Sequence, residues 1–571
     1  MKGSTVGSRR SIVGMLLTGM ALGAILHFGL CAVGSLTPVG QMASFAGVVD
    51  AQAELQNVTV GGEIRLRARY WHNVYDDTLP GGLSLDRVPT FFLPRRPIGL
   101  GGTRSRYIFD ERVTDREIVE QKTLLNVNAD FTNHVNATIV VESFDLWGDD
   151  FRSDYITGAD FRANTGTDVE ITQSFIDVEN LFDTPLTLRI GRQPLAIDKR
   201  WLVSDYISGT LAITFDGVRL MYHGDLWEID AWATKLAEGG VGEQDGDVDF
   251  YGAHATFKPF DWLNATAYYF LVRDGRSLND TNASAPVEWF EDFFGRDNYD
   301  PTYLHTIGTR LRGEAMGWDY DIEAAYQFGE MDAVGSRFVP NGFAYGDDSA
   351  RMDAWGVDVE VGHTFENIFM KPRVKVGGAW MSGEDNREVD FLDWINPIDR
   401  PDSSMSFNRL FSGTVYSWTL DVGQDMSNFK HIRVGAETQL TESVTASITA
   451  TKWWVDEPFE MPAMWKVGRF RVPLAPALSF LSEEGSDDIG TTVLLWLRYN
   501  YSEDFYIALG VEHLFTGDAL EDGSFLHRNG LEFTGGLNGD DGTYFVIDSG
   551  IKFGGPGRAV DLHQIEYRTK K

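Results

Sequence analysis

Basic side chains recur at alternate positions of several short segments, an arrangement that places positive charge along one face of an extended chain. The clearest case is Arg65, Arg67 and Arg69, which are separated by single apolar residues. A guanidinium group stays charged at any working pH and pairs with a carboxylate through two parallel hydrogen bonds. We therefore predict recognition of anions wherever the fold gathers these side chains. The candidate cations that share this parity are Arg65, Arg67, Arg69, Arg189, Arg219, Arg310, Arg312, Arg373, Lys375, Arg433 and Arg498.

Acidic side chains share the same face, which allows a second and purely structural interpretation. If neighbouring extended segments pair, the arginines of one segment can neutralise the carboxylates of the next and simply hold the sheet together. Both interpretations stay open at the level of sequence. The acidic residues of the same parity are Glu63, Asp130, Glu142, Asp177, Glu179, Glu228, Asp230, Glu314, Glu437 and Glu512.

The segments that carry these charges alternate between polar and apolar residues. Between residues 63 and 71, one face carries Ile64 and Leu66 while the other carries the arginines, and residues 122–131 and 431–440 repeat the pattern. Such alternation over about ten residues predicts a strand with one apolar and one polar face. About 19 such segments occur. Because single-chain outer-membrane barrels close with an even number of strands, we expect about 18, with 16 or 20 as alternatives.

The predicted fold class is all-β, a transmembrane antiparallel β-barrel with long extracellular loops. After the N-terminal region no run of about 18 apolar residues occurs, which excludes a bundle of membrane-spanning helices. Connections at residues 223–225 and 502–504 are short and others are long, an asymmetry typical of the periplasmic and extracellular ends of such a barrel. A secreted β-sandwich or propeller is the alternative, although no blade repeat of about 40 to 50 residues is present. The long connections are predicted at residues 81–115, 146–170, 273–302, 384–413, 456–489 and 516–543.

Signals for catalysis, metals and cofactors are poor. The histidines show neither the H-E-x-x-H nor the H-x-H spacing of metal ligands, and neither a G-x-S-x-G elbow nor a Walker loop is present. Cys31 is the only cysteine in the chain. The sequence therefore predicts a protein without catalytic residues, metal or cofactor. An outer-membrane enzyme with its site on the barrel rim remains an alternative.

The first 53 residues resemble a cleaved secretory signal. Basic residues precede an apolar stretch from residue 12 to residue 33, and Ala51 and Ala53 then supply the small side chains that a signal peptidase requires. We predict that residues 1–53 are a signal peptide and that residues 54–571 form a single barrel domain. An uncleaved membrane anchor is the alternative, because the apolar stretch is long for a signal peptide.

The end of the last strand has two alternatives. The strand closes on Phe553 with a polar tail after it, or it runs from Val560 to Tyr567 near the end of the chain. Many bacterial barrels end on an aromatic residue that the barrel-assembly machinery reads, so this machinery is an expected partner.

The chain is strongly acidic, with 84 Asp and Glu against 49 Lys and Arg and a net charge of -35. This balance excludes a chain-wide basic surface for nucleic acid. Much of the acidic excess lies in the connections, as at Asp347-Asp348 and Glu483-Glu484. These charges either keep the loops solvated or bridge through divalent cations to lipopolysaccharide phosphates.

Residues 186–220 carry a more specific pattern. Leu186-Thr-Leu-Arg-Ile-Gly-Arg-Gln-Pro-Leu195 is followed by Thr214-Phe-Asp-Gly-Val-Arg-Leu220. This pattern resembles the alginate-export family of outer-membrane β-barrel porins, in which one strand ends in Gly-Arg-Gln and the next opens with Thr-Phe-Asp-Gly/Ala-x-Arg. The residues that match are Gly191, Arg192, Gln193, Phe215, Asp216, Gly217 and Arg219.

The connection between these two segments departs from the family. Ile197-Asp-Lys-Arg-Trp-Leu202 lacks the family's glycine, and Tyr206-Ile-Ser208 replaces a segment that usually contains tryptophan. The resemblance implies a barrel of about 18 strands in the bacterial outer membrane. It also implies an electropositive pore that passes an acidic polysaccharide, and the departure bears on the substrate more than on the fold. Arg192 has lipid-facing parity, so we expect it at the rim or at a bulge, paired with Asp216 or a loop carboxylate.

We therefore expect an outer-membrane porin or export channel that passes an alginate-like polysaccharide or small anionic solutes through an arginine-lined pore. The expected partners are outer-membrane lipid, lipopolysaccharide and the anionic oligo- or polysaccharide, and no nucleic acid. The alternative is a plugged structural or adhesive barrel whose acidic loops bind cations. Residues 285–301 and 456–489 are long and rich in apolar side chains, so they are candidates for loops that fold inward.

Overall fold

A computed structural model gives the structure of most of the chain after the predicted signal peptide. Residues 1–53 and 555–571 lie outside the described residues, so neither the signal peptide nor a strand at Val560 to Tyr567 is tested. The described residues are 54–73, 115–147, 169–207, 211–237, 247–260, 262–275, 302–331, 350–383, 404–421, 424, 426–457, 460–462, 464–467, 470–473, 482–484, 486–519 and 541–554.

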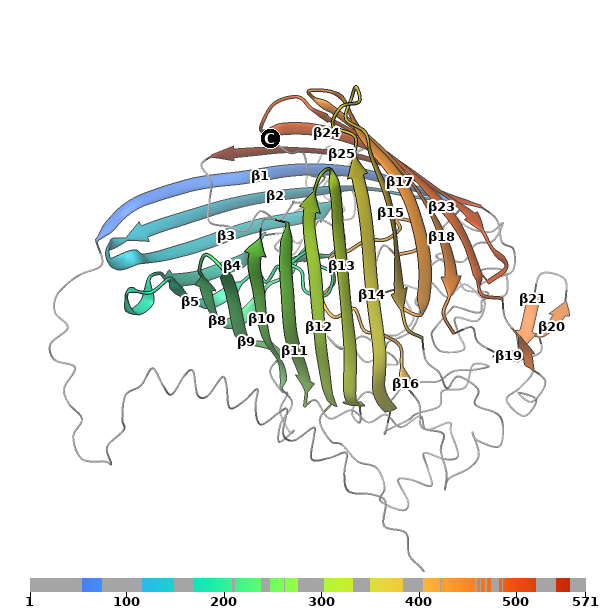
Figure 1. Ribbon diagram of the computed structural model, residues 1–571, viewed down its shortest axis with the longest axis horizontal. Helices are drawn as coiled ribbons and strands as arrows, with labels where there is room; N and C mark the ends of the chain where they lie inside the picture. Colours follow the sequence, from blue (N-terminus) through green and yellow to red (C-terminus); the bar gives the residue numbers. More distant parts are fainter. Residues whose placement is uncertain are drawn as a thin grey trace, which may run out of the picture. The chain divides into compact units, whose positions relative to one another are not determined.

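The alternating segments of the sequence fold as β-strands that lie side by side (Figure 1). The strands of the first half are β1 (Leu55–His72), β2 (Arg116–Phe131), β3 (Val135–Leu146), β4 (Val169–Val178), β5 (Leu186–Gln193), β8 (Phe215–His223), β9 (Trp227–Ala237), β10 (Val248–Phe260) and β11 (Leu263–Asp274). The strands of the second half are β12 (Thr302–Ala315), β13 (Trp318–Met331), β14 (Ala350–Thr364), β15 (Arg373–Met381), β17 (Phe429–Thr441), β18 (Val444–Val455), β23 (Asp488–Asn500), β24 (Phe505–Thr516) and β25 (Gly542–Gly554).

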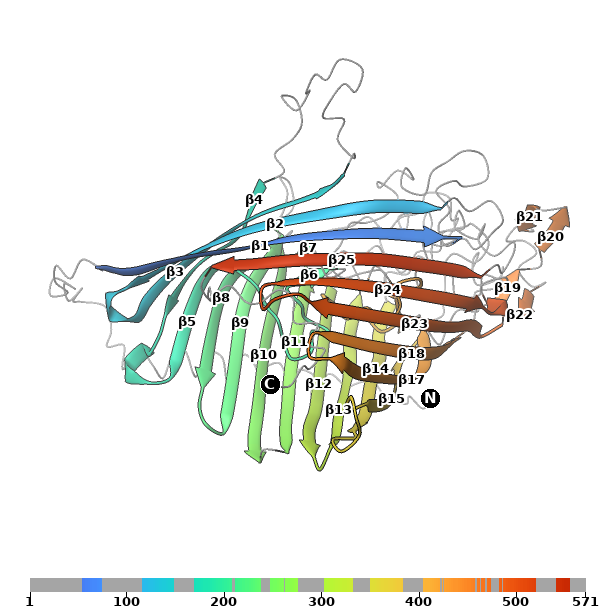
Figure 2. The same cartoon turned by 90° about the horizontal axis from the view of Figure 1, so that it is seen from above.

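These strands close into a barrel, because the first pairs with the last. β1 is antiparallel both to β2, where Ile64 lies opposite Thr123, and to β25, where Ile64 lies opposite Ile551. Figure 2 shows β25 running beside β1 at this seam. The fold is an all-β, closed antiparallel barrel of 18 strands, which confirms the predicted fold class and strand number. Shorter pieces accompany the barrel: β6 (Tyr206–Ile207), β7 (Leu211–Ala212), β16 (Ser404–Met405), β19 (Glu460–Pro462), β20 (Met464–Val467), β21 (Phe470–Pro473) and β22 (Ser482–Glu484).

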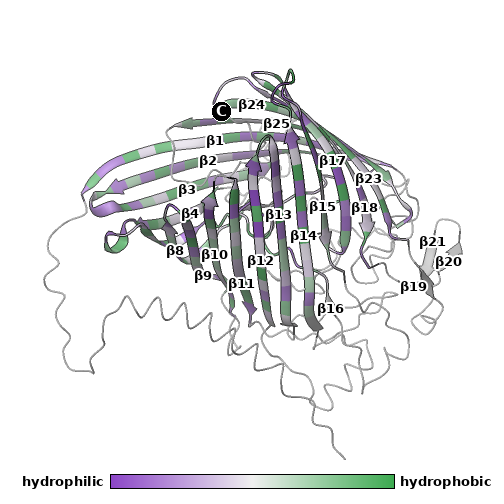
Figure 3. Ribbon diagram, viewed as in Figure 1, coloured by the Kyte–Doolittle hydropathy of each residue, from purple (hydrophilic) through white to green (hydrophobic). Residues whose placement is uncertain are grey.

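The two faces of each barrel strand differ in chemistry. On β1, Ile64 is 39% exposed, whereas the neighbouring Arg65 is 4% exposed. On β17, Ile432 is 57% exposed next to His431 at 3%. Figure 3 shows this alternation as hydrophobic and hydrophilic bands along the strands. The exposed apolar side chains form the belt that faces lipid, and the buried polar side chains face the lumen. Within the described residues, no helix is long and apolar enough to cross a membrane.

The connections differ in length between the two ends of the barrel. At one end the strands are joined by short turns, which places this end in the periplasm by the rule for bacterial barrels. At the other end the connections are long. The short turns are residues 132–134, 179–185, 224–226, 261–262, 316–317, 365–372, 442–443 and 501–504.

Two of the long connections enter the lumen. We call residues 194–207 the first inner loop and residues 404–428 the second inner loop; residues 422, 423 and 425 of the latter are not described. The amide of Phe411 donates to the carbonyl of Leu202 (2.9 Å), and Val203 forms a parallel bridge with Phe411. The two inner loops are therefore joined by backbone hydrogen bonds.

Apolar side chains of both inner loops pack into a core inside the barrel. Trp201 and Phe407 are fully buried and stack with a ring-centroid distance of 5.9 Å. The ring of Phe411 lies 5.2 Å from Phe215 on β8 and 5.0 Å from Phe250 on β10. At this level the lumen is filled by packed side chains.

The connections predicted from the sequence to fold inward are residues 285–301 and 456–489. Residues 285–301 lie outside the described residues, and residues 456–489 are described only in part. The inner loops found here begin after β5 and after β15, and nothing in their composition distinguished them from other connections.

Glycine is required where β5 meets its neighbours. Gly191 has a φ of +127°, and a Cβ there would lie 2.3 Å from the carbonyl oxygen of Ser174. Gly217 lies opposite Gly191, and its Cβ would lie 2.2 Å from the carbonyl oxygen of Ala233. The close approach of the four neighbouring strands β4, β5, β8 and β9 at this point therefore depends on the two glycines of the family-like pattern.

We predict that Gly191→Ala lowers the free energy of unfolding of the barrel by about 1–3 kcal/mol, because the added methyl group meets backbone in a positive-φ conformation. The measurement is thermal unfolding in detergent, followed by the heat-dependent change in electrophoretic mobility. Gly224→Ala is the matched control, since a Cβ there meets only ring atoms of Tyr222. Equal melting temperatures for Gly191→Ala and the unmodified chain would contradict the prediction.

Candidate functional site

All the candidate cations lie on the inner face of the barrel wall, and most are paired with carboxylates. Arg189 donates two hydrogen bonds to Asp177 (2.7 and 2.8 Å), and Arg219 pairs with Asp230. Pairing of this kind holds neighbouring strands together and leaves little charge for a solute. The candidates that pair with carboxylates are Arg65, Arg67, Arg69, Arg189, Arg219, Arg310, Arg373 and Arg433.

The cluster Arg65/Arg67/Arg69, the strongest signal in the sequence, is buried and bridged. The Nε of Arg65 lies 2.8 Å from Asp548 on β25. Glu120 on β2 accepts from both other arginines, at 2.6 Å from the Nε of Arg67 and 2.8 Å from Nη1 of Arg69. All three arginines are less than 5% exposed. This cluster ties β1 to both of its neighbours, across the seam of the barrel.

Arg312, Lys375 and Arg498 differ from the rest. Among the described residues, no carboxylate forms an ion pair with any of them. The Nε of Arg498 donates to Oδ1 of Asn500 (2.9 Å), and its guanidinium lies 4.1 Å from the ring centre of Tyr506. Each of the three lies two or three residues from the short-turn end of its strand. The positive charges of Arg312 and Lys375 still act on Asp198 and Glu360 from beyond ion-pair distance. The three side chains are therefore inward cations near the periplasmic mouth whose charge is not neutralised by direct contact with a carboxylate.

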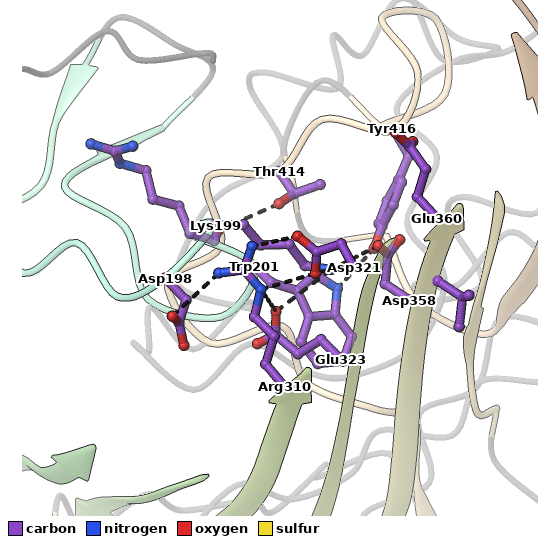
Figure 4. Close-up of polar contacts among 12 residues, drawn as sticks. Asp198, Lys199, Trp201, Arg310, Asp321, Glu323, Asp358, Glu360, Thr414 and Tyr416 are labelled. Carbon is purple, nitrogen blue, oxygen red and sulfur yellow. Dashed lines mark hydrogen bonds and ion pairs between the residues drawn. The ribbon is translucent and has the colours of Figure 1, made fainter. Parts of the chain in front are cut away.

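Lys199 of the first inner loop forms ion pairs with carboxylates of the inner wall (Figure 4). The Nζ of Lys199 lies 2.8 Å from Asp358 on β14 and 3.5 Å from both Asp321 and Glu323 on β13. Burial works against the charge of Lys199, but the nearby carboxylates outweigh it and raise the pKa of Lys199 above its usual value. Lys199 therefore stays charged and anchors the loop to the wall.

The neighbouring Asp198 fixes the same loop to a different part of the wall. It lies 3.0 Å from Nε2 of His254 on β10 and 3.2 Å from Nη1 of Arg310 on β12. Burial opposes ionisation, yet the bond to His254 and the positive charge of Arg310 hold the pKa of Asp198 below its usual value. Asp198 and Lys199 are thus fixed by polar side chains on four wall strands, β10, β12, β13 and β14.

Alternating charges continue along the wall beyond the inner loop. Arg433 on β17 lies 3.1 Å from Asp358 and 3.3 Å from Glu360. Arg373 on β15 lies 3.0 Å from Glu360 and 3.1 Å from Glu437. The result is a network of cations and carboxylates from β12 to β17 in which each charge has an opposite neighbour.

The second inner loop is held at both sides of the lumen. The side-chain amide of Gln327 on β13 donates to the carbonyl of Asn408 (2.6 Å). Across the lumen, Glu512 on β24 accepts from the amide of Thr419 (2.9 Å), and Trp71 on β1 donates to the carbonyl of Trp418 (3.2 Å). The loop therefore bridges the barrel from one wall to the other.

A buried ion pair stabilises the second inner loop internally. Nη1 of Arg409 lies 2.7 Å from Asp421, and both side chains are almost fully buried. Asp421 also accepts from the amide of Tyr416 (3.0 Å), whose hydroxyl accepts from the indole of Trp201 in the first inner loop (2.8 Å). Burial raises the pKa of Tyr416 well above its usual value, so the hydroxyl stays neutral. The two loops form one hydrogen-bonded body.

The family-like motif residues position the first inner loop. Arg192 donates two hydrogen bonds to Asp216 (2.8 and 2.9 Å) on the outer face of β5 and β8. The side-chain amide of Gln193 donates to the carbonyls of Gly191 (3.3 Å) and Gly217 (3.1 Å). These contacts fasten the two strands at the point where the chain leaves the wall for the lumen.

Sequence reasoning missed the acidic partners of the central network. Asp321 and Glu323 alternate in residues 317–328, and Asp358 and Glu360 alternate in residues 351–366, so their inward parity was readable. Asp198 and Lys199 gave no such signal, because they lie in an irregular connection. Within the described part of the chain, no group of three or more His, Cys, Asp or Glu side chains is placed to hold a metal ion.

Comparison with known proteins identifies a family, and several solved structures align with most of this chain. A family model described as alginate export matches residues 105–530. Sequence comparison with curated proteins finds no match. Acinetobacter baumannii OccAB1 is 10% identical, with 88% of this chain and 98% of that chain covered and a TM-score of 0.46. Pseudomonas aeruginosa OccK5 (OpdH) is 11% identical, with 88% and 99% covered and a TM-score of 0.44.

We predict that Lys199→Met loosens the first inner loop, because it removes the loop's ion pairs with Asp358, Glu323 and Asp321. These carboxylates keep Arg433 and Arg310 as cations on the wall, so the loss falls on the anchoring of the loop. The expected loss is on the order of 2 kcal/mol, as for a hydrogen-bonded charge that loses its partner. The measurement is proteolysis of the protein in detergent, with mass spectrometry to locate cuts within residues 194–207. Lys371→Met is the matched control, since Lys371 pairs with Glu366 (3.1 Å) on an exposed turn. An unchanged rate of cleavage would show that Lys199 does not hold the loop.

Proposed function

Since the chain belongs to the alginate export family, we propose that it carries an acidic polysaccharide, or smaller acidic solutes, through a cation-lined lumen across the bacterial outer membrane. The family and the closed barrel make it an outer-membrane channel. The family is one of export channels rather than enzymes, in agreement with the sequence analysis. The nature of the solute and the residues that meet it are the proposal.

The cations that form no contact ion pair with a carboxylate of the described residues carry the proposal. Arg312 on β12, Lys375 on β15 and Arg498 on β23 point into the lumen near the short-turn end, three strands apart in each step around the wall. A polyanion entering from the periplasm meets these charges before it reaches the inner loops. Rings of arginine and lysine favour anions in a pore, and a guanidinium can hold a carboxylate with two hydrogen bonds.

The paired cations have a different part in the proposal. Arg65, Arg67 and Arg69 are already bonded to Asp548 and Glu120, so releasing them to a solute would leave buried carboxylates without partners. Breaking a buried pair in this way costs about 3–5 kcal/mol. We therefore assign these arginines to the wall and the available cations to the solute.

Passage also requires the inner loops to separate. The lumen at their level is filled by packed side chains, among them Trp201 and Phe407. A polysaccharide chain is wider than any gap between packed side chains, because protein interiors are as dense as organic crystals. In our proposal the inner loops form a closed gate in the described structure, and the solute passes when they part.

The packed loops equally favour a second candidate function, a barrel that remains plugged and serves a structural or adhesive role. In that case the acidic outer loops would bind divalent cations that bridge to lipopolysaccharide. Lipopolysaccharide and the barrel-assembly machinery are proposed partners under both functions.

We predict that the combined substitution Arg312→Gln, Lys375→Gln and Arg498→Gln lowers the ratio of anion to cation permeability severalfold, because it removes the available positive charge of the mouth. The measurement is the reversal potential of single channels in a planar bilayer under a potassium chloride gradient. The matched control is Arg189→Gln with Asp177→Asn, which removes a cation together with its paired carboxylate. Selectivity equal to that of the unmodified channel would remove the three cations from the mechanism.

We predict that a disulfide between the two inner loops closes the channel. Val203→Cys and Phe411→Cys in a Cys31→Ser background place two thiols on bridge partners, whose spacing of about 4.8 Å suits a disulfide. Single-channel current is expected to fall on oxidation and to return on reduction. Val203→Cys alone controls for the oxidant. A conductance that does not change on oxidation would show that the solute does not pass between the inner loops. If no current is observed in either state, the plugged barrel is favoured.

A further inference from the structure

Large apolar side chains stand exposed at the tips of consecutive short turns along one arc of the barrel. The arc runs from the turn after β4 to the turn after β14, and every described turn on it contributes at least one such side chain. Apolar groups that gather on a surface usually mark an interaction site. The residues and their exposed fractions are Phe182 70%, Leu226 53%, Phe260 56%, Trp262 49%, Met316 98%, Ile368 51% and Phe369 84%.

The remaining short turns are polar at their tips. The turn after β2 consists of Thr132–His134, and the turns after β17 and β23 carry Glu442 and the pair Glu503 and Asp504. Tyr501 is exposed beside the last of these, but it precedes the tip. The short-turn end of the barrel therefore has an apolar arc and a polar arc.

Backbone strain at two apolar tips argues against chance. Phe182 has a φ of 57° and Met316 a φ of 54°, in the left-handed region that bulky residues rarely adopt. The corresponding position of a polar turn is Asn133, with a φ of 65°, and asparagine suits this conformation. At 70% exposure Phe182 has little packing within the folded chain to offset this strain, which points to a partner outside the molecule.

The strands β5 and β8, which lie above this arc, indicate why lipid is the partner. On the outer face, Arg192 on β5 pairs with Asp216 on β8, and both are about half exposed. From Leu186 to Arg192 the strand climbs six residues, or about 15 Å of height at about 3.3 Å per residue and a tilt of about 40°. The apolar band of an outer-membrane barrel is about 25 Å tall. The strand β5 is therefore too short to span the hydrocarbon below its charged pair.

We infer that the apolar arc is a lipid-binding surface whose turn tips insert into the periplasmic leaflet of the outer membrane, at the boundary between phospholipid headgroups and acyl chains. The arc is continuous with the lipid-facing belt above it, through outward residues such as Trp318 on β13 and Ile190 on β5. Insertion of apolar side chains by about 5–10 Å is typical of interfacial segments. At β5 it supplies the height that this short strand lacks and keeps the ion pair out of hydrocarbon, where burial costs several kcal/mol per ion. The polar arc stays in water.

Cys31 is the only cysteine of the chain, so a single introduced cysteine can be labelled selectively once Cys31 is replaced. In a Cys31→Ser background of the full chain, single substitutions Phe182→Cys, Met316→Cys and Phe369→Cys each receive a nitroxide spin label. Glu442→Cys and Glu503→Cys are the matched controls on the polar arc. The exported barrel is reconstituted into phospholipid vesicles, and the collision rates of each label with oxygen and with a water-soluble nickel complex are measured.

The ratio of oxygen to nickel collisions is expected to be severalfold higher at residues 182, 316 and 369 than at residues 442 and 503. Equal ratios at all five positions would overturn the inference, because the apolar tips would then lie in water. Labels shielded from both reagents would overturn it as well, since a protein surface rather than lipid would cover the arc. Loss of barrel assembly in one variant leaves the other two positions to decide. None of these outcomes depends on what the channel conducts.

Discussion

The closed ring of backbone hydrogen bonds is the constraint from which the remaining features follow. In hydrocarbon an amide or carbonyl without a partner costs several kcal/mol, so a membrane-spanning sheet persists only when its first and last strands pair. β25 meets β1 over twelve register positions, from Gly61–Gly554 to His72–Thr543. Once the ring is closed, the period of two assigns alternate side chains to lipid and to the lumen. The charged side chains of the strands therefore gather inside the barrel because the sheet is closed.

Charges confined to the lumen neutralise one another wherever the register allows it. An acidic chain can therefore have a wall rich in arginine without a strongly positive interior, because carboxylates such as Asp358 and Glu360 lie on the next strands. The balance differs along the axis. Around Lys199 the charges form contact ion pairs, whereas Arg312, Lys375 and Arg498 near the short turns form none with a carboxylate of the described residues. Position along the axis, and not the number of arginines, separates wall residues from candidate solute contacts.

The sequence sufficed to predict everything that follows from local periodicity. Alternation gave the strands, their number and the inward parity of residues such as Arg65 and Arg498, because these depend only on near neighbours in the chain. Pairings such as Arg65 with Asp548 depend on register between strands far apart in the sequence, which local patterns do not encode. The inner loops were missed for a related reason, since residues 194–207 and 404–428 have no period. The segment Ile197–Leu202, which departs from the family pattern, contains Asp198 and Lys199. These two side chains form ion pairs with the inner wall inside the lumen.

The second inner loop has a consequence for how the molecule assembles. Trp418 contacts both sides of the seam, through a hydrogen bond from Trp71 on β1 and a stacked ring, Tyr544, on β25. Trp418 can make both contacts at once only when the two edge strands lie side by side. The second inner loop thus connects β1 and β25 from inside the lumen. Pairing of these two strands and docking of the loop therefore stabilise each other and are expected to occur cooperatively. Separation of β1 from β25 would therefore also disrupt the contacts that Trp418 of the second inner loop makes with these strands.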